Sequence, residues 1–346
     1  MAAIIQTVKP DILLLNEFDS EPGSTDLYQR IALFQQNYLN QDQFGQKSLN
    51  FDFAFTSDVN TGLDSKADLN SDGKLGTPAD AHGFGLFHGQ YNMAVLSRFP
   101  INQDQARSWQ QLRWIDYPNA ELPQKNDGSS WYSETAQSVM RLSSKSHWDV
   151  PIEMGGHTLH FLTAHPTPPV FDGPEDRNGL RNRDEIGLLA SIIDPTRNSA
   201  IKDDRGQTGG FDGSDLFVIA GDMNADPFDG DSASHAIDQL LSHSLINAEV
   251  IPTSTGAQHA ATSQGGNNQQ HQGNPAADTA DFDDTRGPGN LRIDYVLPSR
   301  TLQVLDSGVF WPAPGQTGAD WIEVSDHRLV WLDIQWPASK AAMPSQ

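Results

Sequence analysis

Apolar segments that meet a polar cluster at one end recur along this chain, and they constrain its fold more than any other feature. The run LFVIA at residues 216–220 is followed at once by Asp222 and Asn224 in the turn GDMNADP. The run at 12–15 ends at Glu17, and the run at 159–164 ends at His165. In layered α/β folds, strand ends at one edge converge in space. These clusters therefore predict a single site built from residues distant in sequence.

Hydrophobic periodicity places strands and helices alternately along the chain. Helical spacing is found at residues 4–8, 26–40, 181–193 and 232–243. Strand-like segments are found at 11–15, 51–55, 91–97, 148–154, 157–164, 216–222, 291–298 and 328–336. We therefore expect an α/β fold forming one domain over residues 1–346. Two inserts interrupt it: a structured insert rich in Gly, Asp and Asn at 57–90, and a mobile polar loop at 257–290.

Composition excludes several classes of function. Lys and Arg total 22 against 45 Asp and Glu, a formal charge of −23. Such a surface disfavours broad nucleic-acid binding, although bound cations can reverse the sign locally. Without cysteine there is no disulfide, thiolate metal site or cysteine nucleophile. No run is long enough for a membrane-spanning helix, and this chain shows no signal peptide. Acidic, cysteine-free composition is common in secreted bacterial proteins, so we expect an extracellular or periplasmic location. We also expect a monomer.

The polar clusters carry residues suited to a hard divalent cation and to proton transfer. Carboxylate and amide oxygens without thiolates favour Mg²⁺, Mn²⁺ or Ca²⁺. The expected metal ligands are Glu17, Asp222, Asn224 and Asp326. His327 is the expected general base, with Asp294 holding its ring, and His165 is expected to contact the phosphate. Arg181 or Arg183, at the start of the expected helix, would reach a substrate oxygen.

Each of these residues also has an ordinary structural interpretation. An Asp in a Gly-Asp-x-Asn turn is more often a turn former or a helix cap than a metal ligand. An isolated Asp-His pair usually lies on the protein surface and has no catalytic role. The joint occurrence of the clusters, in one order at successive strand ends, is what favours a common site.

The chain resembles the endonuclease/exonuclease/phosphatase superfamily, which includes DNase I and bacterial sphingomyelinases. The matching segments are PDILLLNEF, NMAVLSRFPI, HFLTAHP, VIAGDMNADP, LRIDYVLPS and VSDHRLVW, and they run in family order from residue 10 to about residue 331. The resemblance implies a four-layer α/β sandwich, with two packed mixed β-sheets flanked by helices. It also implies metal ligation by Glu17 and Asp326, and a role for Asp222 and Asn224 at the nucleophile and metal. His327 would be the general base or acid, oriented by Asp294, while His165 would bind the scissile phosphate.

One departure from the family pattern concerns the first strand. Family members usually begin with a strand ending in an Asn that joins the site, ahead of the helix before DILLLNE. This chain starts inside that helix, so we expect one sheet to lack a strand.

The insert at 57–90 contains a candidate calcium loop, DLNSDGKLGTPAD. Asp68, Asn70 and Asp72 followed by Gly match the alternating acids of an EF-hand-type loop. The loop also contains Lys74, and its last acid, Asp80, lies one position late. A solvated Asp/Asn/Gly turn is the alternative. Such a loop resembles a bacterial, often secreted branch of the superfamily described as phosphatases or phytase-like proteins.

The sequence thus predicts a divalent-metal-dependent hydrolase of phosphate esters, acting by in-line attack of water with a His-Asp pair. Mg²⁺ or Mn²⁺ is expected at the active site and Ca²⁺ at the structural loop. The charge favours a small phosphate ester or a nucleotide over duplex DNA, and leaves phosphodiester and phosphomonoester both open. Two alternatives remain: a secreted DNase-like endonuclease, and a catalytically weak binding module stabilised by metal.

Overall fold

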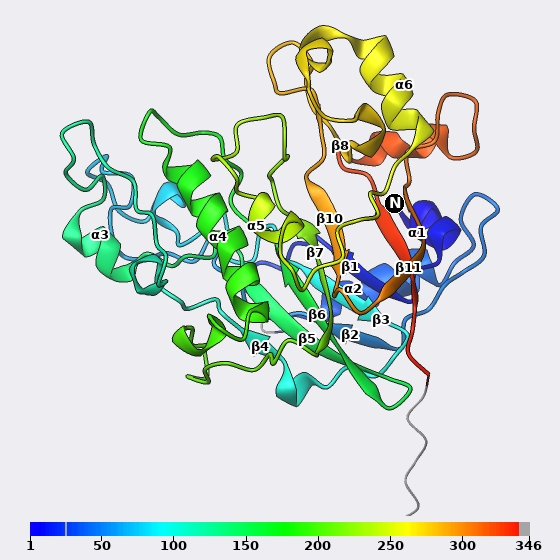
Figure 1. Cartoon of the computed structure of the whole chain (residues 1–346), viewed down its shortest axis with the longest axis horizontal. Coiled ribbons are helices and arrows are strands. Elements are labelled where there is room, and N and C mark those ends of the chain that lie inside the picture. Colours follow the sequence, from blue (N-terminus) through cyan, green and yellow to red (C-terminus); the bar gives the residue numbers. More distant parts are fainter. Residues whose placement is uncertain (25, 339–346) are drawn as a thin grey trace, which may run out of the picture.

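The computed structural model describes residues 1–24 and 26–338 and shows a layered α/β fold (Figure 1). The α-helices are α1 (Ala2–Val8), α2 (Gln29–Phe34), α3 (Glu134–Val139), α4 (Arg177–Ile193), α5 (Asp238–Leu241) and α6 (Thr255–Gln264). The strands of the first half are β1 (Ile12–Leu15), β2 (Phe53–Phe55), β3 (Ala94–Ser97), β4 (Arg107–Ser108), β5 (His147–Met154) and β6 (His157–Ala164). Those of the second half are β7 (Leu216–Asp222), β8 (Ala280–Asp281), β9 (Asn290–Leu291), β10 (Asp294–Pro298), β11 (Gln303–Val309) and β12 (Val330–Gln335).

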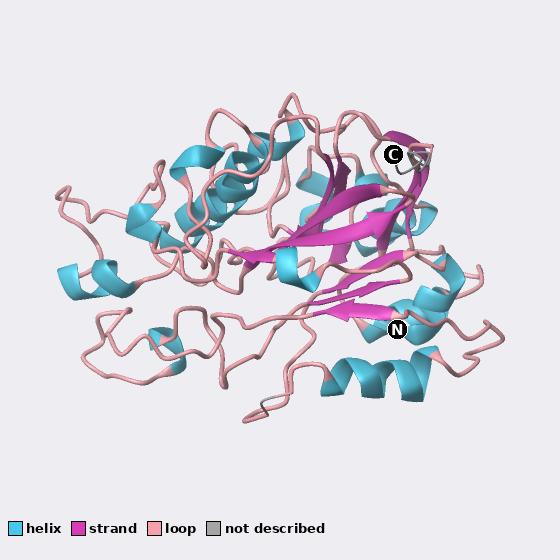
Figure 2. Ribbon diagram, turned by 90° about the horizontal axis from the view of Figure 1, so that it is seen from below, coloured by secondary structure: helices cyan, strands magenta, loops and turns pink. Residues whose placement is uncertain are grey.

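The strands form two main sheets and two short pairs. The larger sheet has the order β10-β7-β6-β5-β4, in which only β6 and β7 are parallel. The smaller sheet has the order β1-β3-β2 and is antiparallel. Strands β11 and β12 form an antiparallel pair, as do β8 and β9. Figure 2 shows the strands gathered between helices on two sides.

Alternate residues of each strand separate the core into layers. On β7, Val218 and Ala220 pack between the sheets, while Phe217 and Ile219 belong to the cluster that includes the buried residues of α4. On β1, Leu13 packs with residues of α1 and α2, and its neighbours face the other sheet. This period-two division is the physical basis of a helix–sheet–sheet–helix sandwich. The predicted four-layer fold is confirmed.

The sequence misplaced some elements. The helix expected at 232–243 is reduced to α5, because His235 has a φ of 63°, a left-handed conformation that a continuous helix does not accept. The segment 257–290, expected to be an irregular loop, overlaps α6 and contains β8 and part of β9. The Ser254 side chain caps α6 by accepting a hydrogen bond from the backbone N–H of Ala257, and Ala257 packs with Trp311. Alanine-rich sequence lacks large apolar residues but forms helix readily.

In the described part of the chain, β1 and β12 each have one edge without a partner strand, and the expected missing strand concerns these edges. Among the described residues, β1 pairs only with β3, and β12 pairs only with β11. The two chain segments meet at a cavity of about 600 Å³ that both of them line. In the part of the chain that the structure describes, no helix has the length and apolarity to cross a membrane.

Candidate active site

The register between β7 and β10 brings two acids together. Asp222 ends β7 and pairs directly with Asp294, the first residue of β10. His327 joins them through a bridge between its backbone and that of Ala280 on β8. Ligand atoms of Asp222, Asp294 and His327 all lie within 4.8 Å of one another. The structure therefore assembles three of the predicted catalytic residues at one point.

Asp294 and His327 form a close acid–imidazole pair. His327 Nδ1 lies 3.0 Å from Asp294 Oδ2 and 3.2 Å from Oδ1. Thr279 Oγ1 donates a hydrogen bond to the same Oδ2 at 2.8 Å, while accepting one from the backbone N–H of Asp294 at 3.0 Å. The ring of Phe282 meets the imidazole edge-on at 5.8 Å. Thr279 and Phe282 were missed by sequence because they lie in the segment expected to be a loop.

The charge on His327 depends on its two acidic neighbours. Burial by itself lowers the pKa of this imidazole, but the carboxylates of Asp294 and Asp222 outweigh burial and raise the pKa to about 10. His327 Nε2 lies 3.8 Å from Asp222 Oδ2. In the absence of a cation, the ring therefore holds both protons at neutral pH.

Asp222 is buried and shared between two histidines. Burial raises the pKa of this carboxyl to about 7. His165, which follows the last residue of β6, places Nε2 3.3 Å from Asp222 Oδ2. Burial, then the nearby charges of Lys145 and His327, hold the pKa of His165 well below its usual range. A neutral His165 that donates from Nε2 leaves Nδ1 as an acceptor, and that buried atom has no hydrogen-bond partner among the described residues.

Asn224 turns back onto Asp222. Its φ of 50° is left-handed, a conformation that Asn tolerates better than most residues. The backbone N–H of Asn224 donates to Asp222 Oδ1 at 2.8 Å, and its Nδ2 donates to the carbonyl of Pro166 at 3.2 Å. Asn224 thus orients the carboxylate and ties the end of β7 to the end of β6.

Helix α4 supports the site through two buried polar side chains that sequence reasoning missed. Glu185 accepts hydrogen bonds from the backbone N–H groups of Ser144 and Thr167, both at 2.6 Å. Asn182 donates from Nδ2 to the carbonyls of Thr167 and Met223, both at 2.8 Å. Both residues lie on the inward face of α4, and a polar residue at such a position is a sequence signal for a buried hydrogen-bonding role. They hold together the loops that carry His165 and Asp222.

Lys145 is a further residue that sequence reasoning missed. It is 5% exposed and belongs to the segment that leads into β5. Burial lowers the pKa of its ammonium, while the carboxylates of Glu185, Asp222 and Glu17 act in the opposite direction. Lys145 thus brings positive charge to the buried side of the acidic cluster.

Of the other two predicted metal ligands, Glu17 lines the cavity and Asp326 does not. Glu17 follows β1 with a left-handed φ of 54° and lines the same cavity as Asp222, Asp294 and His327. Asn16 lines this cavity too, and its buried Oδ1 has no hydrogen-bond partner among the described residues. Asp326 is exposed and lies outside both the cavity lining and the three-residue cluster. Its ligand role stays a prediction.

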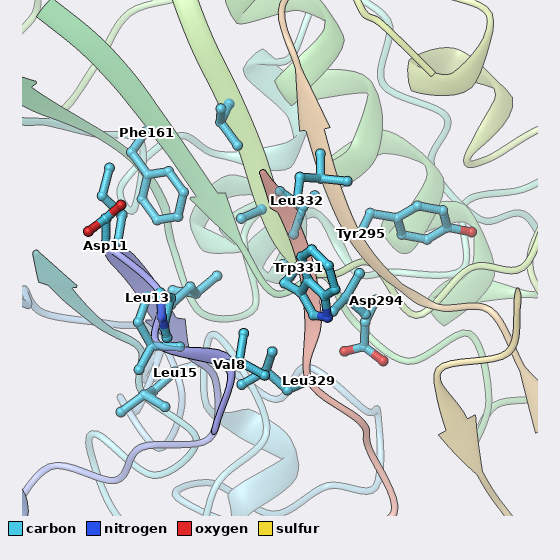
Figure 3. A pocket seen from close by; sticks show the side chains of 18 of the residues that line it. Val8, Asp11, Leu13, Leu15, Phe161, Asp294, Tyr295, Leu329, Trp331 and Leu332 are labelled. Atoms are coloured by element: carbon cyan, nitrogen blue, oxygen red, sulfur yellow. The ribbon is translucent and has the colours of Figure 1, made fainter. Parts of the chain in front are cut away.

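These donors fit a hard divalent cation. Asp222 is a buried carboxylate whose ionised form is disfavoured by desolvation, and Asn16 contributes an unpaired buried amide oxygen. A cation at Asp222 would offset the cost of burying its charge, and sites made of oxygen ligands suit Mg²⁺, Mn²⁺ and Ca²⁺. Figure 3 shows Asp294 at the edge of the cavity that these residues share.

The structure does not bring the two predicted phosphate-binding arginines to this point. Arg181 is buried and donates hydrogen bonds to the backbone carbonyls of Leu142, Arg141 and His82. Its guanidinium binds carbonyls inside the protein and lies outside the cavity lining, so the structure does not place Arg181 at the candidate site. Arg183 forms an ion pair with Glu121 and does not line the cavity.

The acids of the candidate calcium loop bind backbone groups of their own segment. Asp68 accepts from the backbone N–H groups of Asp72 and Gly73, and Asp72 accepts from that of Lys74. Asp80 is fully buried, where it caps a short 3₁₀ helix and accepts from the backbone N–H of Leu69. Calcium binding at Asp68, Asn70 and Asp72 stays a prediction, whereas Asp80 serves the local fold.

Comparisons with known proteins give a family match and similar solved structures. The model of the Endonuclease/Exonuclease/phosphatase family matches residues 1–327. An endonuclease/exonuclease/phosphatase from Beutenbergia cavernae has a TM-score of 0.54 at 16% identity, over 99% of this chain and 66% of that one. A family protein from Leptotrichia buccalis has a TM-score of 0.49 at 16% identity, over 97% and 91% of the two chains. The human Nocturnin catalytic domain has a TM-score of 0.44 at 15% identity, over 96% and 83%.

This chain therefore spans just under two thirds of the Beutenbergia cavernae chain. No curated protein is a significant match. Because the family model covers most of the sequence and the Beutenbergia cavernae structure shares the fold, the chain belongs to the endonuclease/exonuclease/phosphatase family.

Proposed function

We propose that this protein hydrolyses phosphate esters with the help of a divalent cation. The observation that carries the proposal is the convergence of Asp222, Asp294 and His327, whose ligand atoms lie within 4.8 Å of one another beside a cavity. The family consists of metal-dependent phosphoesterases and nucleases, which supports the reaction class. We also propose that a water molecule attacks the phosphorus atom and that the substrate is a phosphate ester.

Glu17, Asp222 and Asn16 would hold the cation, since all three residues line one cavity and carry oxygen ligands. When bound, Mg²⁺ or Mn²⁺ supplies charge neutralisation at the phosphoryl oxygens and lowers the pKa of a bound water. Asp326 joins this ligand set only if its exposed side chain turns inward. Ca²⁺ is proposed separately for the loop at Asp68, Asn70 and Asp72.

His327 is the residue proposed to give or take the proton. Asp294 fixes the ring by accepting from Nδ1, so Nε2 faces Asp222 and the reaction space. With its pKa raised to about 10, the imidazolium is the proton-donating form, which suits protonation of a leaving oxygen. Any cation that neutralises Asp222 removes part of the attraction that holds this proton. The same ring then approaches the range in which it accepts a proton from water.

His165 and Asn224 are proposed to position the reacting groups. Both bind Asp222, His165 through Nε2 and Asn224 through its backbone N–H. The contact of His165 with the scissile phosphate remains a prediction.

The proposed substrate is a small or soluble phosphate ester or a nucleotide. A formal charge of −23 opposes the approach of a long polyanion, and duplex DNA is the most highly charged candidate. Phosphomonoesters and phosphodiesters both remain within the proposal. The same acidic, cysteine-free composition supports an extracellular or periplasmic monomer, which cell fractionation and light scattering would test.

The test compares p-nitrophenyl phosphate, bis-p-nitrophenyl phosphate and plasmid DNA, each with Mg²⁺, Mn²⁺ or Ca²⁺. We expect metal-dependent hydrolysis of a small ester, and a loss of about 10²-fold or more in kcat for His327→Ala and for Asp222→Ala. His235→Ala is the matched control. This exposed histidine also lies 3.0 Å from a carboxylate, that of Asp238, and it is not part of the cavity lining.

The outcomes separate the alternatives. Plasmid degradation at rates that rival those of the small esters would favour the DNase-like endonuclease. Hydrolysis that survives both His327→Ala and Asp222→Ala would show that the assigned residues are not catalytic. A wild-type protein that binds metal and gains thermal stability, yet hydrolyses none of the substrates, would favour the binding module.

A further inference from the structure

Arg328 directly follows His327 in the chain, and its side chain is buried, with the residue only 7% exposed. Its guanidinium donates from Nη1 to the backbone carbonyls of Ser325 and His327. These two carbonyls lie on either side of the Asp326–His327 pair. One side chain thus binds the backbone at both ends of the turn that carries the proposed proton donor and a predicted metal ligand.

The same guanidinium is also anchored outside this turn. Arg328 Nη2 donates to Asp281 Oδ2 on β8 at 2.9 Å, and the guanidinium carbon lies 4.4 Å from the centre of the Trp311 ring. A planar guanidinium can donate along its edge in a fixed fork while its face stacks on a ring, which the ammonium group of a lysine cannot. The side chain therefore joins the turn to two segments that are distant from each other in sequence.

Backbone hydrogen bonds hold the turn against β8 as well. The N–H of Arg328 donates to the carbonyl of Thr279 at 2.7 Å, and the N–H of Asp281 donates to the carbonyl of Asp326 at 2.8 Å. Thr279 also binds the Asp294 carboxylate through its hydroxyl. The position of the imidazole relative to Asp294 therefore depends on how the turn is held against β8.

The donors of Arg328 are directed at the protein. Both Nη atoms bind protein oxygens, and the buried Nε has no hydrogen-bond partner among the described residues. Burial lowers the pKa of this guanidinium, while the carboxylates of Asp281 and Asp326 act in the opposite direction. A buried ion pair costs free energy of desolvation, so it is weak evidence for a role in stability alone.

Arg107 has a closely similar set of contacts and provides an internal comparison. It is also 7% exposed, and it donates to the Asp203 carboxylate at 2.7 Å and to two backbone carbonyls of the segment 207–209. Its guanidinium carbon lies 4.8 Å from the centre of the Trp109 ring. None of these residues lines the cavity of the candidate site. Substitution of Arg107 therefore measures what the loss of such contacts does to stability alone.

We propose that Arg328 is a positioning residue for the hydrolysis, which holds the turn at 325–327 against β8 so that the His327 imidazole stays at the Asp294 carboxylate. It acts through His327 and does not touch the substrate. The kinetic test of this role rests on the proposed phosphoesterase function. A second test, by hydrogen exchange, does not depend on activity.

The kinetic test compares Arg328→Lys with Arg107→Lys on the small ester that the wild type hydrolyses fastest. Lysine keeps the positive charge but cannot bind one carboxylate and two carbonyls in a single plane. We expect kcat to fall by about tenfold or more in Arg328→Lys at unchanged KM, because a small displacement of a catalytic group slows the reaction strongly. Arg107→Lys should lose a similar amount of thermal stability and keep the wild-type kcat.

Two further measurements separate positioning from a loss of folded protein. Guanidinium chloride at millimolar concentration should restore part of the kcat of Arg328→Ala, since Arg328 lines the cavity, and sodium chloride should not. Asp281→Asn removes the charged partner at a side chain that is 23% exposed, so this variant should fold and show a several-fold fall in kcat. Asp203→Asn, which removes the partner of Arg107, should leave kcat unchanged.

Amide hydrogen exchange of the metal-free protein measures the same arrangement without catalysis. In Arg328→Lys, we expect the amides of residues 281 and 328 to exchange about tenfold faster than in the wild type, because the bonds between the turn and β8 open more often. In Arg107→Lys these two amides should exchange at the wild-type rate.

A wild-type kcat in both Arg328→Lys and Asp281→Asn would overturn the proposal. A raised KM at unchanged kcat would overturn it too, because it would identify Arg328 as a substrate-binding residue. An equal fall in kcat for Arg107→Lys would show a general effect of stability. If the wild type hydrolyses none of the esters, the proposed function fails and the exchange rates decide. Unchanged exchange at residues 281 and 328 in Arg328→Lys would then refute the positioning role.

Discussion

Replacing Asp294 by Asn should lower the pKa of His327 by about 2–3 units. The two charged groups lie 3.0 Å apart, and at an effective dielectric constant of about 20 such a pair is worth about 5 kcal/mol, or about 4 pKa units. The His327 side chain is 29% exposed, so water screens part of this attraction. Asn removes the charge and keeps one oxygen, which can accept from Thr279 and from His327 Nδ1, while its NH2 group takes the place of the other carboxylate oxygen. The pKa should therefore fall from about 10 to about 7–8.

The measurement is an NMR titration of the imidazole protons of His327 in metal-free protein. Because its pKa in the folded state is raised, His327 stabilises the fold fully below its ordinary pKa of about 6.5, and this contribution is lost as pH rises through about 10. In the Asp294→Asn variant, the stabilisation by His327 should be lost at lower pH, as pH rises through about 7–8. A control is Asp149→Asn, which removes the acid that raises the pKa of His160 and should leave His327 unchanged. A pKa of His327 that stays near 10 in the Asp294→Asn protein would refute the electrostatic argument.

Three further predictions concern stability. Asp184→Asn should raise the free energy of unfolding by about 1–3 kcal/mol above pH 6 and by nothing below about pH 3.8, as measured by urea denaturation. The reason is that burial raises the pKa of Asp184 to about 6, so its ionisation destabilises the folded state across that window; an equal gain at both pH values would contradict this. Arg181→Met should cost about 3 kcal/mol or more, because buried carbonyls lose their donors, with KM unchanged in the folded protein; a raised KM at unchanged stability would restore the substrate role. A calcium-selective chelator, in excess Mg²⁺, should lower the melting temperature of the wild type but not of Asp72→Ala, and no change in the wild type would count against the calcium loop.

Local sequence pattern was sufficient to predict a strand or a site residue where the segment itself carries the relevant residues. The apolar run that becomes β7 is buried on both faces, so it reads as a strand from composition alone, and the polar turn after it identifies Asp222 and Asn224. The pairing of Asp294 with His327 followed from residue chemistry, and the structure confirms the contact at 3.0 Å. The four-layer arrangement followed from the alternation of strands and helices together with the family resemblance.

Segments whose structure depends on distant contacts could not be predicted in this way. α6 carries few large apolar residues, and its burial depends on Trp311, more than 50 positions away from Ala257. Arg181 has the chemistry of a phosphate ligand, but the fold places carbonyls of two other segments around it. Thr279 gains its role only because β8 and β10 come together beside Asp294.

The sequence by itself determined which residues can bind a hard cation and move a proton, and it determined the order of the strands that carry them. The tertiary structure alone decided the charge on His327, the burial of Asp222 and the cavity between β1 and β12. Those properties depend on distances and desolvation summed over several segments, and no local pattern contains them. Strand identity is local information, whereas the partner that a strand edge receives is decided by the whole fold.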